Sequence, residues 1–288
     1  KRINRKKMKK LILLLLAVVA TYSVQAQIET PAPSPAAKVW QTVGMTDVTL
    51  EYSRPSMRGR TIFGDLVPYD MLWRTGANAR TLITFSTDVM VDGQALKAGT
   101  YAIFTKPGAS TWEVFFYTDT QGGGTPAEWD ETKIAAKTVV TVDAMPSPVE
   151  TFTMTFDDLT STSAVLGILW EKAYIGVKFD VPTDAMVMKA IEKTMAGPDA
   201  GDYYASAVYF YSEGKDIAKA KTWMDKAMAM TTKPAYWQLR QQSLIYAKAG
   251  DKKGAIEAAK KSLAGAEAAG NADYVKMNKD SLKEWGAK

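Results

Sequence analysis

The sequence predicts two domains, an antiparallel β-sandwich or jelly-roll-like domain over residues 38–181 and an α-helical hairpin-repeat domain over residues 183–288. In the first stretch, apolar and polar residues alternate with a period of two, and threonines and aromatic residues are frequent. After Pro182, Ala, Lys and Met dominate and the apolar residues are spaced by three and four. Short strands without helical periodicity, followed by helices alone, indicate two separately packed layers of structure.

The first 26 residues have the composition of a signal peptide. Seven basic residues lie within the first ten, residues 11–20 are wholly apolar, and Val24-Gln25-Ala26 places small residues at a cleavage site. The apolar run is shorter than the roughly 20 residues of a bilayer-spanning helix. We therefore expect an exported protein, periplasmic or secreted, with no stable membrane span after signal cleavage. Residues 27–37 contain three prolines and are expected to form a solvated linker.

Individual strands follow from the alternation. They are expected at 38–43, 48–53, 81–86, 88–91, 94–96, 100–105, 111–117, 134–142, 151–156, 162–170 and 173–180. Asp92-Gly93 separates two short apolar runs and predicts a two-residue hairpin turn.

The helical half carries a weak internal repeat. Small residues recur with a spacing of 35, at Ala220 and Ala255 and again at Ala227 and Ser262. This pattern resembles degenerate tetratricopeptide repeats. Two such units are few for a stable array, so flanking helices at about 184–196 and 272–285 are expected to cap it.

Composition limits the chemistry. The 288 residues include no His and no Cys, which excludes Ser-His-Asp and Cys-His catalytic units, zinc sites built from His and Cys, and disulfides. We expect no catalytic residue, metal or cofactor. The formal charge of +5 becomes −2 once the seven leader charges are removed, with −6 in residues 27–180 and +4 in residues 181–288. Neither part has a dense basic stripe, so nucleic-acid binding is not expected.

Arginines are concentrated in one segment. Six arginines follow the leader, and five of them lie within 27 residues, at Arg54, Arg58, Arg60, Arg74 and Arg80. The guanidinium is a planar fork that binds carboxylate or phosphate and stacks on aromatic rings. The stretch from Tyr52 to Arg80 lacks clean alternation, which predicts a long ordered loop, a common location of function on a β scaffold.

Two interpretations of this loop remain open. In the first, the arginines pair with Glu51, Asp65, Asp70 and Asp88 to pin the loop, and Trp73 is a core aromatic. In the second, the loop binds a ligand, with Arg58, Arg60 and Arg74 as anion forks, Trp73 as a stacking platform and Asn78 as a hydrogen-bonding orienter. Arg54 and Arg80 are candidates either for holding the loop or for binding the ligand.

The motifs of this segment resemble a secreted bacterial family catalogued as domain of unknown function 2911. The resemblance rests on Ser34-Pro35, Tyr52-Ser53-Arg54-Pro55, Arg58-Gly59-Arg60, Val67-Pro68-Tyr69, Trp73-Arg74-Thr75-Gly76-Ala77-Asn78 and Ala98-Gly99-Thr100-Tyr101. It covers about residues 34–180. It implies an exported β-rich domain, often followed by helical repeats, with no established activity.

Three functions compete. The leading hypothesis is a non-enzymatic envelope protein whose β domain binds an anionic or glycan ligand and whose helical repeats engage a protein partner. The first alternative is a polysaccharide hydrolase or lyase using carboxylates at Glu51, Asp65 or Asp70 with Tyr52 or Tyr69. The second alternative is a purely structural adaptor.

Overall fold

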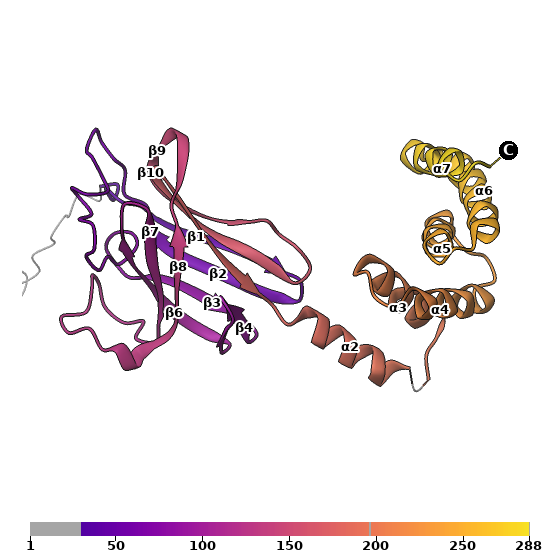
Figure 1. Cartoon of the computed structure of the whole chain (residues 1–288), viewed down its shortest axis with the longest axis horizontal. Coiled ribbons are helices and arrows are strands. Elements are labelled where there is room, and N and C mark those ends of the chain that lie inside the picture. The colour runs from indigo at the N-terminus through magenta and orange to yellow at the C-terminus, as the bar shows by residue number, and fades with distance from the viewer. Residues whose placement is uncertain (1–29, 196, 288) are drawn as a thin grey trace, which may run out of the picture. The chain divides into compact units, whose positions relative to one another are not determined.

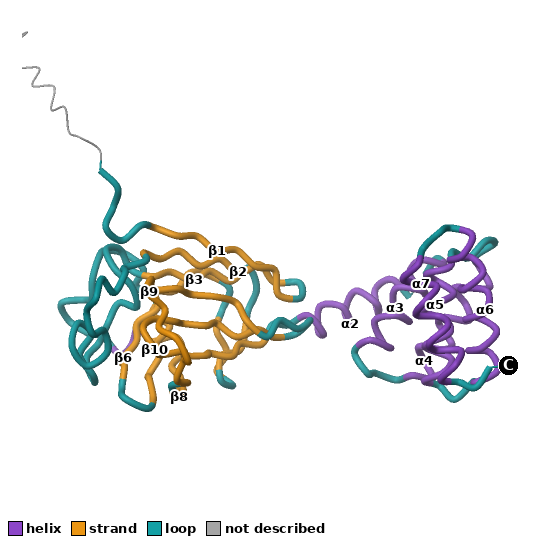
Figure 2. The backbone as a smooth tube through the Cα atoms, turned by 90° about the horizontal axis from the view of Figure 1, so that it is seen from above, coloured by secondary structure: helices purple, strands orange, loops and turns teal. Residues whose placement is uncertain are grey.

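The computed structural model describes residues 30–195 and 197–287 (Figures 1 and 2). The chain divides into a β unit that ends at Asp180 and a helical unit that comprises the residues from Val181 together with the short segment Gly44–Thr46, which confirms the predicted order of β then α. The predicted signal peptide, residues 1–26, lies outside the described residues. Within the described ranges, no helix has the length and hydropathy needed to cross a membrane.

Two sheets form the β unit. The six-stranded sheet has the order β1 (Ala36–Val43), β2 (Thr46–Ser53), β3 (Thr81–Phe85), β6 (Gly99–Pro107), β7 (Thr111–Tyr117) and β8 (Ile134–Thr141). The four-stranded sheet has the order β5 (Gln94–Leu96), β4 (Val89–Val91), β10 (Ser163–Asp180) and β9 (Asp143–Asp157). Figure 1 shows β9 and β10 lying across the larger sheet.

The core lies between the two sheets. Leu50 of β2 pairs in register with Ile83 of β3, and both are fully buried on the inner face of the larger sheet. Phe85 meets Phe179 of β10 edge to face, with ring centroids 5.5 Å apart. The alternation of strand residues therefore buries one face of each sheet against the other, as expected for a sandwich.

One strand is longer than predicted. The expected strands 162–170 and 173–180 form a single strand, β10, interrupted by an irregularity at Glu171, whose φ is 53°. The Glu171 carboxylate accepts the backbone N–H groups of Ile62 and Phe63 at 3.4 and 3.2 Å. The irregularity is a bulge whose acidic side chain holds the arginine-rich loop. The predicted Asp92-Gly93 turn joins β4 to β5.

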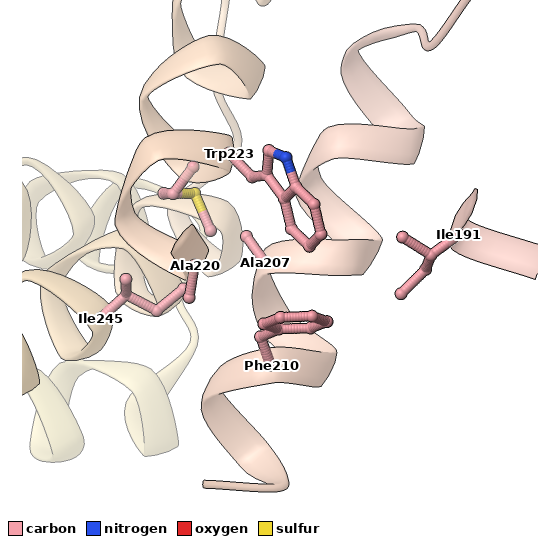
Figure 3. Packing of buried hydrophobic residues seen from close by; sticks show 7 residues of the cluster. Ile191, Ala207, Phe210, Ala220, Trp223 and Ile245 are labelled. Carbon is pink, nitrogen blue, oxygen red and sulfur yellow. The ribbon is translucent and has the colours of Figure 1, made fainter. Parts of the chain in front are cut away.

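The helical unit contains six helices among its described residues. They are α2 (Thr183–Thr194), α3 (Ala200–Ser212), α4 (Ile217–Met230), α5 (Tyr236–Lys248), α6 (Lys252–Ala268) and α7 (Ala272–Glu284). The four small residues spaced by 35 are all fully buried, two on α4 and two on α6. In Figure 3, Phe210 and Trp223 point toward one another beside Ala207 and Ala220, and their ring centroids are 4.8 Å apart. Small residues thus allow close approach of consecutive helices, and aromatic side chains fill the remaining space.

Candidate functional site

Arg54 and Arg80 hold the loop between β2 and β3. Arg54 donates from Nε to the carbonyl of Phe152 at 3.0 Å and from Nη2 to the hydroxyl of Thr153 at 2.7 Å. Arg80, with only 7% of its side chain exposed, donates to the Asp119 carbonyl at 2.7 Å and pairs with the Asp119 carboxylate at 3.1 Å. Both guanidiniums are thus engaged within the protein itself.

Arg58 and Arg60 direct their guanidiniums to backbone oxygens. Arg58 donates from Nη2 to the carbonyl of Pro33 at 2.9 Å. Arg60 donates to the carbonyls of Met57 and Ser56, at 2.9 and 2.8 Å, and thereby folds back on its own turn. Both side chains are exposed, but the two guanidiniums do not converge on a common cavity.

The proline-rich segment that precedes β1 is fastened to this loop. Three consecutive carbonyls, those of Pro33, Ser34 and Pro35, accept hydrogen bonds from the Arg58 guanidinium, the Asn78 amide at 3.2 Å and the Arg54 backbone N–H at 2.9 Å. Residues 33–35, called the strap below, therefore differ from the solvated linker expected over 27–37. Asn78 uses its amide to fix the strap.

Trp73 is a core residue. Its ring stacks on Trp170 at 5.9 Å and meets Phe152 edge to face at 5.4 Å, and only 9% of the residue is exposed. The indole N–H donates to the carbonyl of Gly76 at 3.2 Å. The expectation of a ligand-stacking platform at Trp73 is corrected by this burial, because neighbouring rings occupy the position that a ligand would need.

The backbone conformation and the close neighbours of residue 76 require a glycine at this position of the motif. Its φ is 145°, and a Cβ there would lie 3.0 Å from the Thr81 hydroxyl oxygen and 3.2 Å from the Ser53 carbonyl. Thr75 beside it is fully buried with a φ of 56°, and its hydroxyl donates to Thr105 at 3.0 Å. The loop therefore contains strained backbone conformations that the surrounding packing and hydrogen bonds hold in place.

The carboxylates considered for catalysis are dispersed. Glu51 pairs with Lys38 at 2.6 Å, and the side chain of Tyr52 is buried with its hydroxyl bonded to the backbone of Met154. Asp65 and Asp70 are exposed and line neither of the hollows described below. Among the described residues, no group of three or more acidic side chains is arranged to hold a metal ion.

Arg74 is used differently from the other four arginines. Its neighbour Trp73 exchanges two backbone hydrogen bonds with Thr105 of β6, at 2.7 and 2.9 Å, and points into the core. Side chains alternate along an extended segment, so Leu72 and Arg74 are directed to the outer face of the six-stranded sheet. Arg74 makes no hydrogen bond or ion pair with the described part of the chain, and its Nε is buried without a partner.

An aromatic hollow of about 450 Å³ lies on this outer face. Its apolar lining consists of Leu72, Phe115, Trp129 and Ile134, and its polar lining consists of Lys106, Glu113, Glu131 and Lys137. Strand register places these side chains together, because Phe115 of β7 is opposite Lys137 of β8 and Glu113 is opposite Lys106 of β6. Residues directly opposite on antiparallel strands share a face of the sheet.

Trp129 supplies the largest ring of the hollow. One face of it stacks on Tyr117, with centroids 4.5 Å apart and an interplanar angle of 17°. Its edge meets Phe115 at 5.4 Å, and the Lys137 ammonium lies 5.2 Å from the centre of the Phe115 ring. Aromatic rings with cations beside them are suited to ligands that have both an apolar face and polar groups.

The loop that carries Trp129 is held by ionised carboxylates. Hydrogen bonds from the hydroxyl and the backbone N–H of Thr132 lower the pKa of Asp130, which caps the short helix Glu131–Lys133. The backbone N–H of Gln121 lowers the pKa of Asp119, which also pairs with Arg80. Both acids therefore stay charged at neutral pH and keep Trp129 in place.

The hollow has unpaired charges. Glu113 pairs with Lys137 at 3.2 Å, whereas Lys106 and Glu131 pair with no residue that the structure describes. Arg74 is on the same face of the sheet but does not line the hollow, whose own lining holds two lysines and two glutamates. The hollow therefore offers the unpaired ammonium of Lys106 to an acidic group of a ligand and the unpaired carboxylate of Glu131 to hydroxyl groups.

Sequence reasoning missed this site. The run Phe115-Phe116-Tyr117 places aromatic rings on both faces of β7, which is the signal of a strand covered on both sides. The loop from Gln121 to Lys133 contains three consecutive glycines, and its tryptophan was not considered as a site residue. None of the residues proposed from sequence lines this hollow, although Arg74 and Arg80 lie on the same face of the sheet.

Comparisons with known proteins give one family. A family model described as a protein of unknown function (DUF2911) matches residues 34–179, just over half of the chain. The match covers Ser34 and Pro35 of the strap, the arginine-rich loop and the strands of both sheets. No curated protein and no solved structure matches the chain. The chain therefore belongs to the DUF2911 family of proteins of unknown function.

Proposed function

We propose that the protein is an exported envelope protein that binds an anionic glycan through the aromatic hollow of its β unit, without chemical turnover, and engages a protein partner through its helical repeats. The observation that carries the proposal is the aromatic hollow itself. A volume of about 450 Å³ is within the usual range of small-ligand sites, and its lining combines rings with a few polar groups.

The chemistry of the lining favours a sugar that bears an acidic group. A sugar ring has an apolar C–H face that packs on Trp129 and Phe115, and hydroxyls that bond to charged rim residues. The unpaired ammonium of Lys106 in the hollow is suited to a carboxylate or phosphate. The predicted export signal supports contact with envelope glycans.

Binding without turnover is supported by the composition of the chain, which has no His or Cys to act as a general base or nucleophile. Glycoside hydrolysis in most families requires two carboxylates on either side of the bond. The hollow contains two, Glu113 in an ion pair with Lys137 and the unpaired Glu131, so turnover has its own test. Release of shorter fragments from a bound oligosaccharide, abolished by Glu131→Gln, would replace this proposal with the hydrolase alternative.

The helical unit contributes a different surface. Its exposed large apolar side chains include Trp237, 49% exposed on α5, and Met230 and Met277. Exposed aromatic and methionine side chains are enriched in protein–protein interfaces. The charge of +4 over residues 181–288 favours an acidic partner surface.

Isothermal titration with acidic and neutral oligosaccharides of equal length tests the glycan proposal. Galacturonate oligomers are the acidic probe and glucose oligomers the neutral one. We expect the acidic series to bind at least about tenfold more tightly. Trp129→Ala should weaken it about 30-fold, which corresponds to about 2 kcal/mol, the loss typical of a central aromatic contact.

The matched control removes an exposed tryptophan from the other unit. Trp237→Ala should leave the glycan affinity unchanged, because Trp237 lies on α5. Trp129→Phe retains an aromatic ring and should recover part of the affinity if Trp129→Ala disturbs folding. Equal binding of wild type and both Trp129 variants would overturn the site assignment.

A further inference from the structure

A second cavity lies on the outer face of the same sheet. This edge hollow of about 400 Å³ is lined by residues of β1, the end of β2 and the start of β3, among them Lys38, Glu51, Ala79, Arg80 and Leu82. It contains none of the residues that line the aromatic hollow.

Strand register places both hollows on one face. Glu51 of β2 is opposite Leu82 of β3, Leu82 is opposite Ala102 of β6, and Ala102 is opposite Tyr117 of β7. This row runs from the edge hollow to the ring on which Trp129 stacks. Three strand spacings of about 4.8 Å separate β2 from β7, so the two hollows are roughly 14 Å apart.

The two hollows border one buried apolar cluster. Leu82 of the edge hollow packs on the cluster formed by Ala102, Phe104, Phe115 and Tyr117, and Leu72 and Trp129 of the aromatic hollow pack on the same cluster. Between the hollows, the Arg80 guanidinium lies 5.5 Å from the centre of the Phe104 ring and is neutralised by Asp119. A chain that passes from one hollow to the other therefore lies over a neutralised ion pair.

The edge hollow also has an exposed aromatic side chain beside it. Trp40 of β1 is 62% exposed, the largest exposed fraction among the big hydrophobic side chains of the described residues. It is two residues from Lys38, so alternation places it on the same side of β1 as the lining of the edge hollow. A large exposed ring on a soluble surface commonly marks a contact site.

We infer that the β unit binds an extended, linear glycan chain that occupies both hollows at once, with Trp129 and Trp40 as the two stacking rings. This inference rests on the proposed function at the aromatic hollow. Occupation of a second hollow by the same chain converts a second binding step into an intramolecular one, which raises affinity without any change in the first site.

The test compares a galacturonate dimer, which is too short to reach both hollows, with a decamer. We expect the decamer to bind wild type about 100-fold more tightly than the dimer, the lower end of the usual gain from linked sites. A decamer presents several overlapping dimer units, and that statistical gain is no more than about tenfold. The larger gain therefore reports the second hollow.

Variants of the edge hollow separate the two claims. Trp40→Ala, and independently Ala79→Glu, should bring the decamer affinity down to within about tenfold of the dimer affinity and leave dimer binding unchanged. Trp129→Ala should weaken both lengths. A decamer gain of tenfold or less in wild type, or a gain that persists in both edge variants, overturns the two-hollow inference while the proposed function stands. Wild type that binds neither length overturns the proposed function itself.

Discussion

The arginine-rich loop and the outer face of the six-stranded sheet differ in how their polar groups are used. In the loop, four of five guanidiniums donate to carbonyl or side-chain oxygens of the protein itself, and Trp73 is enclosed by other rings. On the outer face, Lys106 and Arg74 have no partner among the described residues, and Trp129 lines a hollow. A cluster of arginines and aromatic residues can therefore serve to stabilise a loop as readily as to bind a ligand. Polar groups without a partner in the protein indicate the ligand-binding case.

The largest expected effect concerns the two tryptophans. Trp73→Ala removes a buried ring that contacts Phe63, Phe152 and Trp170, and should lower the free energy of unfolding by about 3–5 kcal/mol. Urea titration of the variant measures this. Trp129→Ala should cost clearly less, because that ring is only half-buried. An equal loss of unfolding free energy in the two variants would contradict the assignment of Trp73 to the core and of Trp129 to the surface.

Removing one positive charge should weaken ligand binding only when the charge lies in the aromatic hollow. Lys106→Gln should weaken binding of acidic oligosaccharides about tenfold, since a hydrogen bond to a charged group contributes roughly 1.5 kcal/mol. Calorimetric titration at fixed ionic strength gives the affinity. Lys97→Gln is the control, because this substitution makes the same change in net charge away from the hollow, at a lysine that pairs with Asp88. A similar loss in both variants would indicate a nonspecific charge effect.

The strap offers a smaller effect inside the loop. Arg58→Ala removes the hydrogen bond to the Pro33 carbonyl and should release the strap locally at a cost of about 1 kcal/mol. The amide of Arg54, which donates to Pro35, should then exchange with solvent about five times faster. Arg60→Ala should leave that exchange rate unchanged, because Arg60 contacts only Met57 and Ser56. Faster exchange in both variants would argue against the assigned strap contact.

The smallest expected effect is on alkaline stability. Burial and the hydrogen bond to Asp157 raise the pKa of Tyr174 to about 12 from its ordinary value of 10.0. The unfolded chain loses this proton first, so the stabilisation is complete below pH 10 and is lost as pH rises toward 12. Thermal unfolding of Tyr174→Phe should therefore depend less on pH in this interval than that of wild type. An identical pH dependence would exclude the contribution of Tyr174.

Most strands were predictable because one face of each sheet is buried and the sequence alternates accordingly. The single strand β10 was not, since the charged pair Glu171 and Lys172 interrupts the alternation, and the contact of the Glu171 carboxylate with the loop backbone depends on the fold. The pinned-loop interpretation named the core position of Trp73 but expected acidic partners at Glu51, Asp65, Asp70 and Asp88. Arg54, Arg58 and Arg60 bind backbone carbonyls instead, which have no sequence signature, and the acidic partner of Arg80 is Asp119. Trp129 was missed because its position depends on a loop folding back over β7.

Nuclear magnetic resonance of the indole N–H groups during titration with an acidic oligosaccharide tests the central contrast most directly. Resonances are assigned by replacing Trp73 and Trp129 singly with Phe. We predict that the Trp129 indole signal shifts progressively to saturation, while the Trp73 signal, whose N–H donates to Gly76, keeps its position. A shift of the Trp73 signal with a stationary Trp129 signal would contradict the assignment of the ligand site to the outer face of the sheet.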